Sequence, residues 1–185
     1  ADFTNGLIDN PKAGPFVLGA IQNPNTGERA KNAAKELGGK VWLESRTIEN
    51  PIFATTRTQT PVVIELNSAD KDKFATELFG PIALLIKTKN TEESVALARE
   101  LAEEHGAISC GAYTTDEAMK EHIADQMSLA ATPVSFNLTG GIFVNQNAAF
   151  SDYHVTGGNP AGNASFTNPG YVNGRFTWVG MKELA

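Results

Sequence analysis

The sequence predicts an α/β fold in which a parallel sheet is built from βαβ units. Apolar, strand-like runs alternate with helical patterns over residues 81–137, at spacings that suit crossover helices. The chain has 185 residues, which is enough for one ordinary domain with its own core. Hydrophobic residues make up 41% of the chain and charged residues 19%, a composition typical of globular proteins rather than disordered ones.

The N-terminal half is predicted to hold one clear helix. Residues 1–20 contain several turn dipeptides and are expected to be irregular. A helical pattern follows over 25–37, and Gly38-Gly39 ends it. Residues 41–43 and 62–66 are predicted strands, and the second is rich in β-branched side chains.

The C-terminal half carries the clearest alternation. Asn90, with Glu93 three residues later, has the spacing of a capping box, and Gly106 ends the helix that it begins. The expected elements are a strand over 81–87, this helix, a strand over 107–113, a helix from 115 or 116, and strands over 134–137 and 142–145. Residues 145–174 have the composition of a long ordered loop, and Phe176–Val179 is a predicted edge strand that needs a partner.

Composition excludes several classes of function. The net charge is −6 and no basic run occurs, so neither nucleic acid nor an anionic membrane is expected as a partner. No apolar run approaches the roughly 18 residues of a membrane span, and no signal peptide is visible at the start. No spacing typical of a metal site is present. The single cysteine forbids an internal disulfide and indicates a reducing, cytoplasmic compartment.

That cysteine, Cys110, is interpreted as a packing residue. It lies inside a predicted strand between small residues, whereas a nucleophile needs exposure and a nearby base. No residue of the chain is therefore assigned a catalytic role.

The segment 77–81 is the strongest candidate site. Glu77 and Phe79 precede Gly80 and Pro81, which place them in a turn directly before a buried strand. A carboxylate there can accept hydrogen bonds from two sugar hydroxyls, while the ring offers a flat apolar wall. The alternative interpretation is a helix C-terminus with a hydrophobic plug.

These residues carry a family resemblance. Glu77, Phe79, Gly80 and Pro81 resemble the Glu-x-Phe-Gly-Pro motif of aldehyde dehydrogenases, and residues 106–116 and 142–145 are similar to later strands of that family. The resemblance covers roughly residues 17–185 and implies a three-layer aldehyde dehydrogenase-like catalytic-domain lobe. It also implies NAD or NADP as cofactor, with Glu77 at the nicotinamide ribose and Phe79 beside the nicotinamide.

One branch of the family is more similar still. Residues 137–146, 149–154 and 159–161 look like the branch linked to phenylacetic acid degradation, PaaN, which implies an acyl-CoA aldehyde as substrate. Residues 155–158 read Val-Thr-Gly-Gly where the family has Pro-Phe-Gly-Gly, so substrate contacts are expected at Phe150 or His154 instead.

The nucleophilic cysteine, the general-base glutamate and the dinucleotide-binding half of the family precede the matched region and are absent from this chain. Residues 1–172 are accordingly predicted to be the C-terminal part of a catalytic domain, inactive alone. Residues 173–185 are predicted to be an oligomerisation segment of a homo-oligomer. The alternative is a stand-alone, non-catalytic binding or oligomerisation module derived from the same fold.

Overall fold

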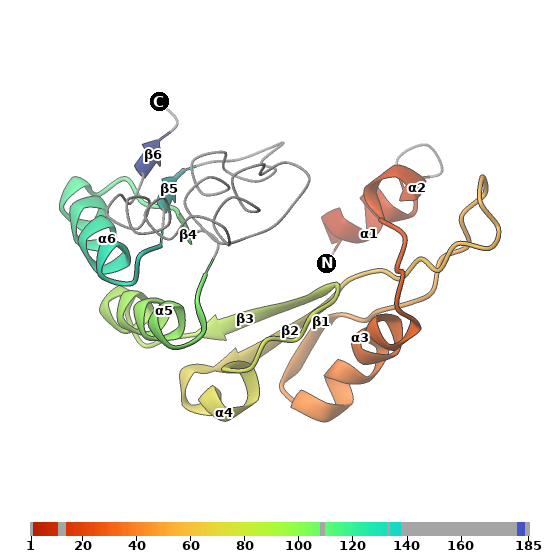
Figure 1. The fold of residues 1–185 in the computed structure, drawn as a ribbon, viewed down its shortest axis with the longest axis horizontal. Coiled ribbons are helices and arrows are strands. Elements are labelled where there is room, and N and C mark those ends of the chain that lie inside the picture. The colour runs from red at the N-terminus through yellow and green to blue at the C-terminus, as the bar shows by residue number, and fades with distance from the viewer. Residues whose placement is uncertain (1, 11–13, 108–109, 133, 138–180, 184–185) are drawn as a thin grey trace, which may run out of the picture. The chain divides into compact units, whose positions relative to one another are not determined.

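The computed structural model describes residues 2–10, 14–107, 110–132, 134–137 and 181–183 (Figure 1). They form two compact units, Ala1–Thr88 and Lys89–Ala185. The first contains α1 (Asp2–Ile8), α2 (Gly14–Val17), α3 (Pro24–Leu37), β1 (Lys40–Leu43), β2 (Val62–Asn67), the short 3-10 helix η1 (Ser68–Asp70), α4 (Lys71–Phe74) and β3 (Ile82–Lys87). The second contains α5 (Thr91–His105), β4 (Cys110–Ala112), α6 (Glu117–Leu129), β5 (Val134–Phe136) and β6 (Met181–Glu183).

The first unit is built on the sheet β1-β2-β3. Strands β2 and β3 are parallel and are joined through η1 and α4, so they form a crossover unit, although no helix was expected between them. Strand β1 is antiparallel to β2, which the expected parallel sheet did not include. The two strands are antiparallel because the residues that connect them, 44–61, contain no crossover helix. These residues instead fold back on themselves, with a β-bridge between Thr47 and Gln59.

Helix α3 covers one face of this sheet. Its Ala33 packs against Val62, Ile64 and Leu66 of β2, all at most 2% exposed. The predicted helix is confirmed, but it begins at Pro24 because the Asn23 side chain accepts a hydrogen bond from the Asn25 backbone N–H.

The expectation of an irregular N-terminus was wrong, because α1 and α2 lie within residues 2–17. Helix α1 accommodates Gly6 and buries Ile8 to 5% exposure. Burial of one apolar side chain therefore outweighs the turn signals at this end of the chain.

The second unit packs α5 and α6 against the parallel strands β4-β5-β6. Asn90 caps α5 by accepting from the Glu93 N–H at 2.9 Å, as its spacing predicts. Asp116 caps α6 in the same way. The core of the unit joins both helices to β4 and β5, and its buried members are Val95, Ala112, Ile123, Met127, Val134 and Phe136.

The α/β fold class is confirmed, but the single parallel sheet expected to run from β3 through α5 to β4 was wrong, because β3 and β4 belong to two separate sheets. Strand β4 is described only over Cys110–Ala112, shorter than predicted, and β6 was not predicted at all. The predicted strands over 142–145 and 176–179 lie outside the described residues. No helix in the described ranges combines the length and apolarity that a membrane crossing needs.

We expect Ile64→Ala to lower the free energy of unfolding by about 2–5 kcal/mol, because the side chain is fully buried between α3 and the sheet. Urea denaturation followed by tryptophan fluorescence measures the change. The control is Ile52→Ala, whose side chain is 59% exposed and should cost less than about 0.5 kcal/mol. Equal effects of the two substitutions would show that the sheet core is placed wrongly.

Candidate functional site

The predicted motif forms the connection between α4 and β3. Helix α4 ends at Phe74, whose ring packs on the apolar core beside α3. The chain then runs through an irregular stretch before β3 begins at Ile82. Glu77 is exposed here, and the Phe79 side chain is 70% exposed. Both predicted cofactor residues therefore lie at the surface of one short segment.

Helix α3 anchors this segment from about fifty residues earlier in the chain. The Arg29 guanidinium donates a hydrogen bond from Nη1 to the Phe79 carbonyl oxygen at 2.6 Å. Gly80 has a φ of 150°, and a Cβ placed on it would lie 3.1 Å from Thr26 Cγ2. A glycine is needed at this point because the backbone conformation and the close approach to α3 both oppose a side chain.

Strand β2 holds the other end of the segment. The Pro81 carbonyl accepts from the Val62 N–H at 2.9 Å, and Ile82 then begins the parallel pairing with Val62. The segment 77–81 is thus fixed at Phe79 and Gly80 by α3 and at Pro81 by β2. Thr26 and Arg29 were missed in the sequence because nothing in the local pattern of α3 points to residues 79 and 80.

This arrangement suits a ligand that carries hydroxyl groups next to a flat ring. An exposed carboxylate accepts hydrogen bonds from hydroxyls, and those with a charged acceptor are worth about 1.5–3 kcal/mol each. An aromatic ring exposed to this extent can also be covered by a flat group stacked or packed on it. Glu77 and Phe79 are therefore both accessible to such a ligand, and Phe79 does not act as a hydrophobic plug because it is not buried.

Cys110 lies in β4 and packs against the core of the second unit. Its burial raises the pKa of the thiol above the ordinary value, so the reactive thiolate is disfavoured. Both the apolar neighbours of Cys110 and the raised pKa of its thiol support the interpretation of this cysteine as a packing residue.

The two predicted substrate residues, Phe150 and His154, lie outside the described residues. Among the residues that the structure does describe, no cluster of three or more His, Cys, Asp or Glu side chains is placed to hold a metal ion.

Comparison with known proteins gives consistent matches. The model of the Aldehyde dehydrogenase family matches residues 4–165. A lactaldehyde dehydrogenase of Methanococcus maripaludis is 27% identical over 151 residues, which are 79% of this chain and 28% of that protein. The crystal structure of an NAD-dependent aldehyde dehydrogenase from Burkholderia multivorans is 41% identical, with a TM-score of 0.75 over 92% of this chain and 30% of that one. The chain therefore spans less than a third of the length of either protein.

We expect Gly80→Ala to destabilise the protein by about 1–3 kcal/mol, because alanine is strained at this φ and its methyl group presses on Thr26. Thermal unfolding followed by circular dichroism measures the effect. Gly27→Ala is the matched control, since Gly27 is helical and a Cβ there would have only Ile21 Cδ1 near it, at 3.9 Å. That substitution should stabilise by up to about 1 kcal/mol; destabilisation of similar size at both glycines would contradict the role given to Gly80.

Proposed function

The chain belongs to the aldehyde dehydrogenase family, and we propose that it forms one wall of the cofactor site of an NAD(P)-dependent aldehyde dehydrogenase. The observation that carries the proposal is the anchored segment 77–81, which presents a carboxylate and an aromatic ring at the surface. The NAD dependence of the Burkholderia multivorans protein, of which the chain covers 30%, supports a nicotinamide cofactor.

Each residue of the segment has a distinct role in the proposal. The Glu77 carboxylate accepts hydrogen bonds from the hydroxyls of the nicotinamide ribose, and the Phe79 ring lies against the nicotinamide. Arg29 and Gly80 are positioning residues, since they fix the backbone at the Phe79 carbonyl and directly after it. When bound, the cofactor supplies the acceptor for the hydride that leaves the aldehyde carbon.

The covalent chemistry of the reaction is assigned to another part of the enzyme. A thiolate must attack the aldehyde carbon to give a thiohemiacetal, loss of the hydride must convert this to a thioester, and a glutamate-activated water must then hydrolyse the thioester. Cys110 does not suit the first role, because it is packed in β4 and burial raises its pKa. The chain alone is therefore proposed to be inactive.

We further propose the substrate class and the assembly. The similarity of residues 137–161 to the phenylacetate-degradation branch favours a ring-opened acyl-CoA aldehyde, with Phe150 or His154 as residues of the substrate pocket. The aromatic segment 176–179 favours a homo-oligomer in which a strand of one subunit pairs with a neighbour. Residues 1–172 then form the catalytic-domain part and residues 173–185 the oligomerisation segment.

We expect the purified 185-residue chain to show no aldehyde-dependent reduction of NAD+ or NADP+, because its cysteine is not placed to act as the nucleophile. The absorbance of the reduced nicotinamide measures this, with the whole Burkholderia multivorans enzyme as positive control. Turnover that persists after the chain is purified a second time, and that is lost in the Cys110→Ala variant, would overturn the proposal that the chain alone is inactive.

We expect Glu77→Gln to raise the KM for the nicotinamide cofactor about tenfold, because an amide accepts hydroxyl hydrogen bonds less strongly than a carboxylate. The substitution is tested in a chimaera in which this chain replaces the matching 30% of the Burkholderia multivorans enzyme, because that enzyme supplies the rest of the site. Glu36→Gln, at an exposed position in the last turn of α3, is the matched control and should leave the KM unchanged. An unchanged KM in both variants would remove Glu77 from the cofactor site.

A further inference from the structure

Three consecutive polar residues are buried directly before β2. Thr58, Gln59 and Thr60 are 3%, 5% and 1% exposed. Burying polar groups is costly unless they are hydrogen-bonded, so a buried polar run needs a reason in the fold. The candidate site ends beside this run, because Gln59 and Pro81 border the same hollow of about 310 Å³.

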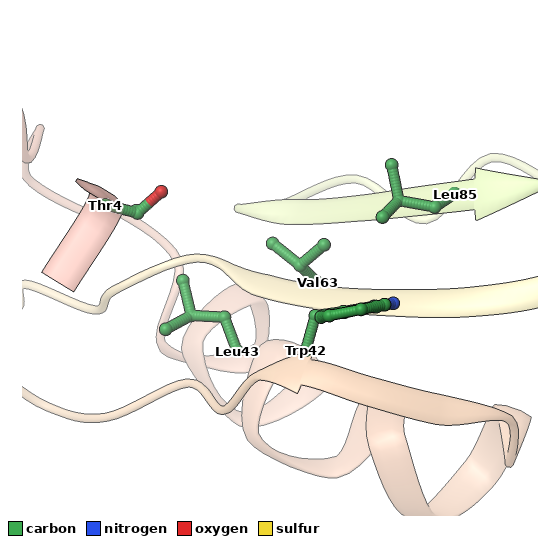
Figure 2. Close-up of a pocket in the computed structure, with 5 residues that line it drawn as sticks. All are labelled: Thr4, Trp42, Leu43, Val63 and Leu85. Atoms are coloured by element: carbon green, nitrogen blue, oxygen red, sulfur yellow. The ribbon is translucent and has the colours of Figure 1, made fainter. Parts of the chain in front are cut away.

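The polar run belongs to an antiparallel ribbon that continues the pairing of β1 with β2. Leu43 pairs with Val63 at the end of the two strands, and Figure 2 shows both residues beside a hollow of about 260 Å³. Thr47 forms its bridge with Gln59, four residues after Leu43 and four before Val63, so the register is the same at both pairs. The paired residues beyond the two strands are here called the ribbon root, residues 45–47 and 59–60.

Side chains replace part of the regular backbone pairing at Thr60. Two residues that form a hydrogen-bonded antiparallel pair exchange both of their N–H···O=C bonds. The Thr60 N–H does donate to the Arg46 carbonyl, at 2.9 Å. The Arg46 N–H, however, donates to the Thr60 hydroxyl at 2.8 Å, and the Ser45 hydroxyl donates to the Thr60 carbonyl at 2.5 Å. These three hydrogen bonds hold Thr60 and keep its carbonyl out of the regular pairing.

Gln59 orients the serine that holds the Thr60 carbonyl. Its Nε2 donates to Ser45 Oγ at 2.8 Å, and its Oε1 accepts from Thr47 Oγ1 at 3.0 Å. Because the Ser45 oxygen accepts from Gln59, its own proton is free to point at the Thr60 carbonyl. The hydrogen bonds thus run in one direction from Thr47 to Thr60, and the buried amide and carbonyl are satisfied within one network.

The backbone turns about its axis at Pro61, between the ribbon root and β2. In a regular strand, the N–H groups of residues two apart point toward the same neighbouring strand. Here the Thr60 N–H points toward the ribbon partner on the β1 side, whereas the Val62 N–H donates to the Pro81 carbonyl on the β3 side, at 2.9 Å. Pro61 has a fixed φ and no N–H of its own. The direction of the Val62 N–H therefore depends on how Thr60 is held.

We propose that Thr60 is a positioning residue for the segment 77–81, and through it for the nicotinamide cofactor. It acts through the hydrogen bond from Val62 to Pro81, whose direction the ribbon root sets. This inference rests on the proposed function, because that function places the carboxylate and the ring of the segment at the cofactor.

The segment needs this second anchor because a glycine separates it from the first. Arg29 of α3 holds the Phe79 carbonyl. Gly80 follows and has a wider range of backbone conformations than any other residue type, so a hold at Phe79 alone does not fix what comes after it. With Pro81 fixed from the ribbon root as well, the backbone is held on both sides of Gly80.

Threonine-to-valine substitutions at two neighbouring buried positions test the proposal. Thr60→Val removes the hydroxyl that accepts from Arg46 and keeps the size of the side chain. The Arg46 N–H then regains the regular bond to the carbonyl of residue 60, which rotates the peptide before Pro61. Thr58→Val is the matched control, because the Thr58 hydroxyl is buried and has no hydrogen-bond partner in the described part of the chain. Thr60→Ser keeps the hydroxyl and should restore the behaviour of the unaltered chain.

Amide hydrogen exchange of the 185-residue chain, measured by NMR, gives the first readout. We expect Thr60→Val to speed exchange at Val62 about tenfold relative to Leu66, further along the same strand, because one hydrogen bond is weakened locally. Thr58→Val and Thr60→Ser should leave this ratio unchanged. Equal acceleration at Val62 and Leu66 would overturn the proposal, since it would reflect a loss of overall stability alone.

The KM for the nicotinamide cofactor, measured in the chimaera with the Burkholderia multivorans enzyme, gives the second readout. We expect Thr60→Val to raise this KM about fivefold and to change kcat by less than about twofold, because the binding segment shifts while the reacting groups lie elsewhere. Neither Thr58→Val nor Thr60→Ser should change the KM.

The two readouts separate this proposal from the proposed function. An unchanged KM in Thr60→Val, together with a raised KM in Glu77→Gln, would overturn the positioning role. An unchanged KM in both variants, with faster exchange at Val62, would reject the cofactor role of the segment and would support the hold of Thr60 on it.

Ser45→Ala applies if Thr60→Val does not fold. It removes the donor to the Thr60 carbonyl from a half-buried position and leaves Thr60 itself unaltered. We expect the same selective increase in exchange at Val62, with Thr58→Val again as the control. An increase at Val62 no greater than that at Leu66 would reject the proposal.

Discussion

The close contact of α3 with the sheet is the constraint on which the rest of the first unit depends. Small side chains allow it, since Ala30 and Ala33 are at most 2% exposed. Gly39, which lies between the end of the helix and β1, is placed where a Cβ would be 2.4 Å from the Glu65 carbonyl oxygen. A Cβ on Gly80 would lie 3.1 Å from Thr26 Cγ2. The helix therefore sets the sheet core and the position of the candidate site together, and a bulkier residue at any of these contacts would move both.

Sequence reasoning succeeded where structure is determined locally. The caps at Asn90 and Asp116 and the β-branched run of β2 each carry their own signal, and the structure places these elements where they were expected. The motif at Glu77 and Phe79 was likewise visible. The contact between Arg29 and Phe79 joins residues fifty positions apart, so no local pattern contains it. The same holds for the antiparallel pairing of β1, which depends on how residues 44–61 fold back.

The cysteine and the proposed cofactor residues of the chain lie in two different environments. Its cysteine is held in a strand core, where burial opposes ionisation. The carboxylate and ring proposed to hold the cofactor instead lie on an irregular surface segment, which Arg29 of α3 and Val62 of β2 hold through its backbone carbonyl groups. A rigid scaffold that presents a binding segment is the usual way in which a fold carries function. This division explains why the chain fits a binding wall better than a reaction centre.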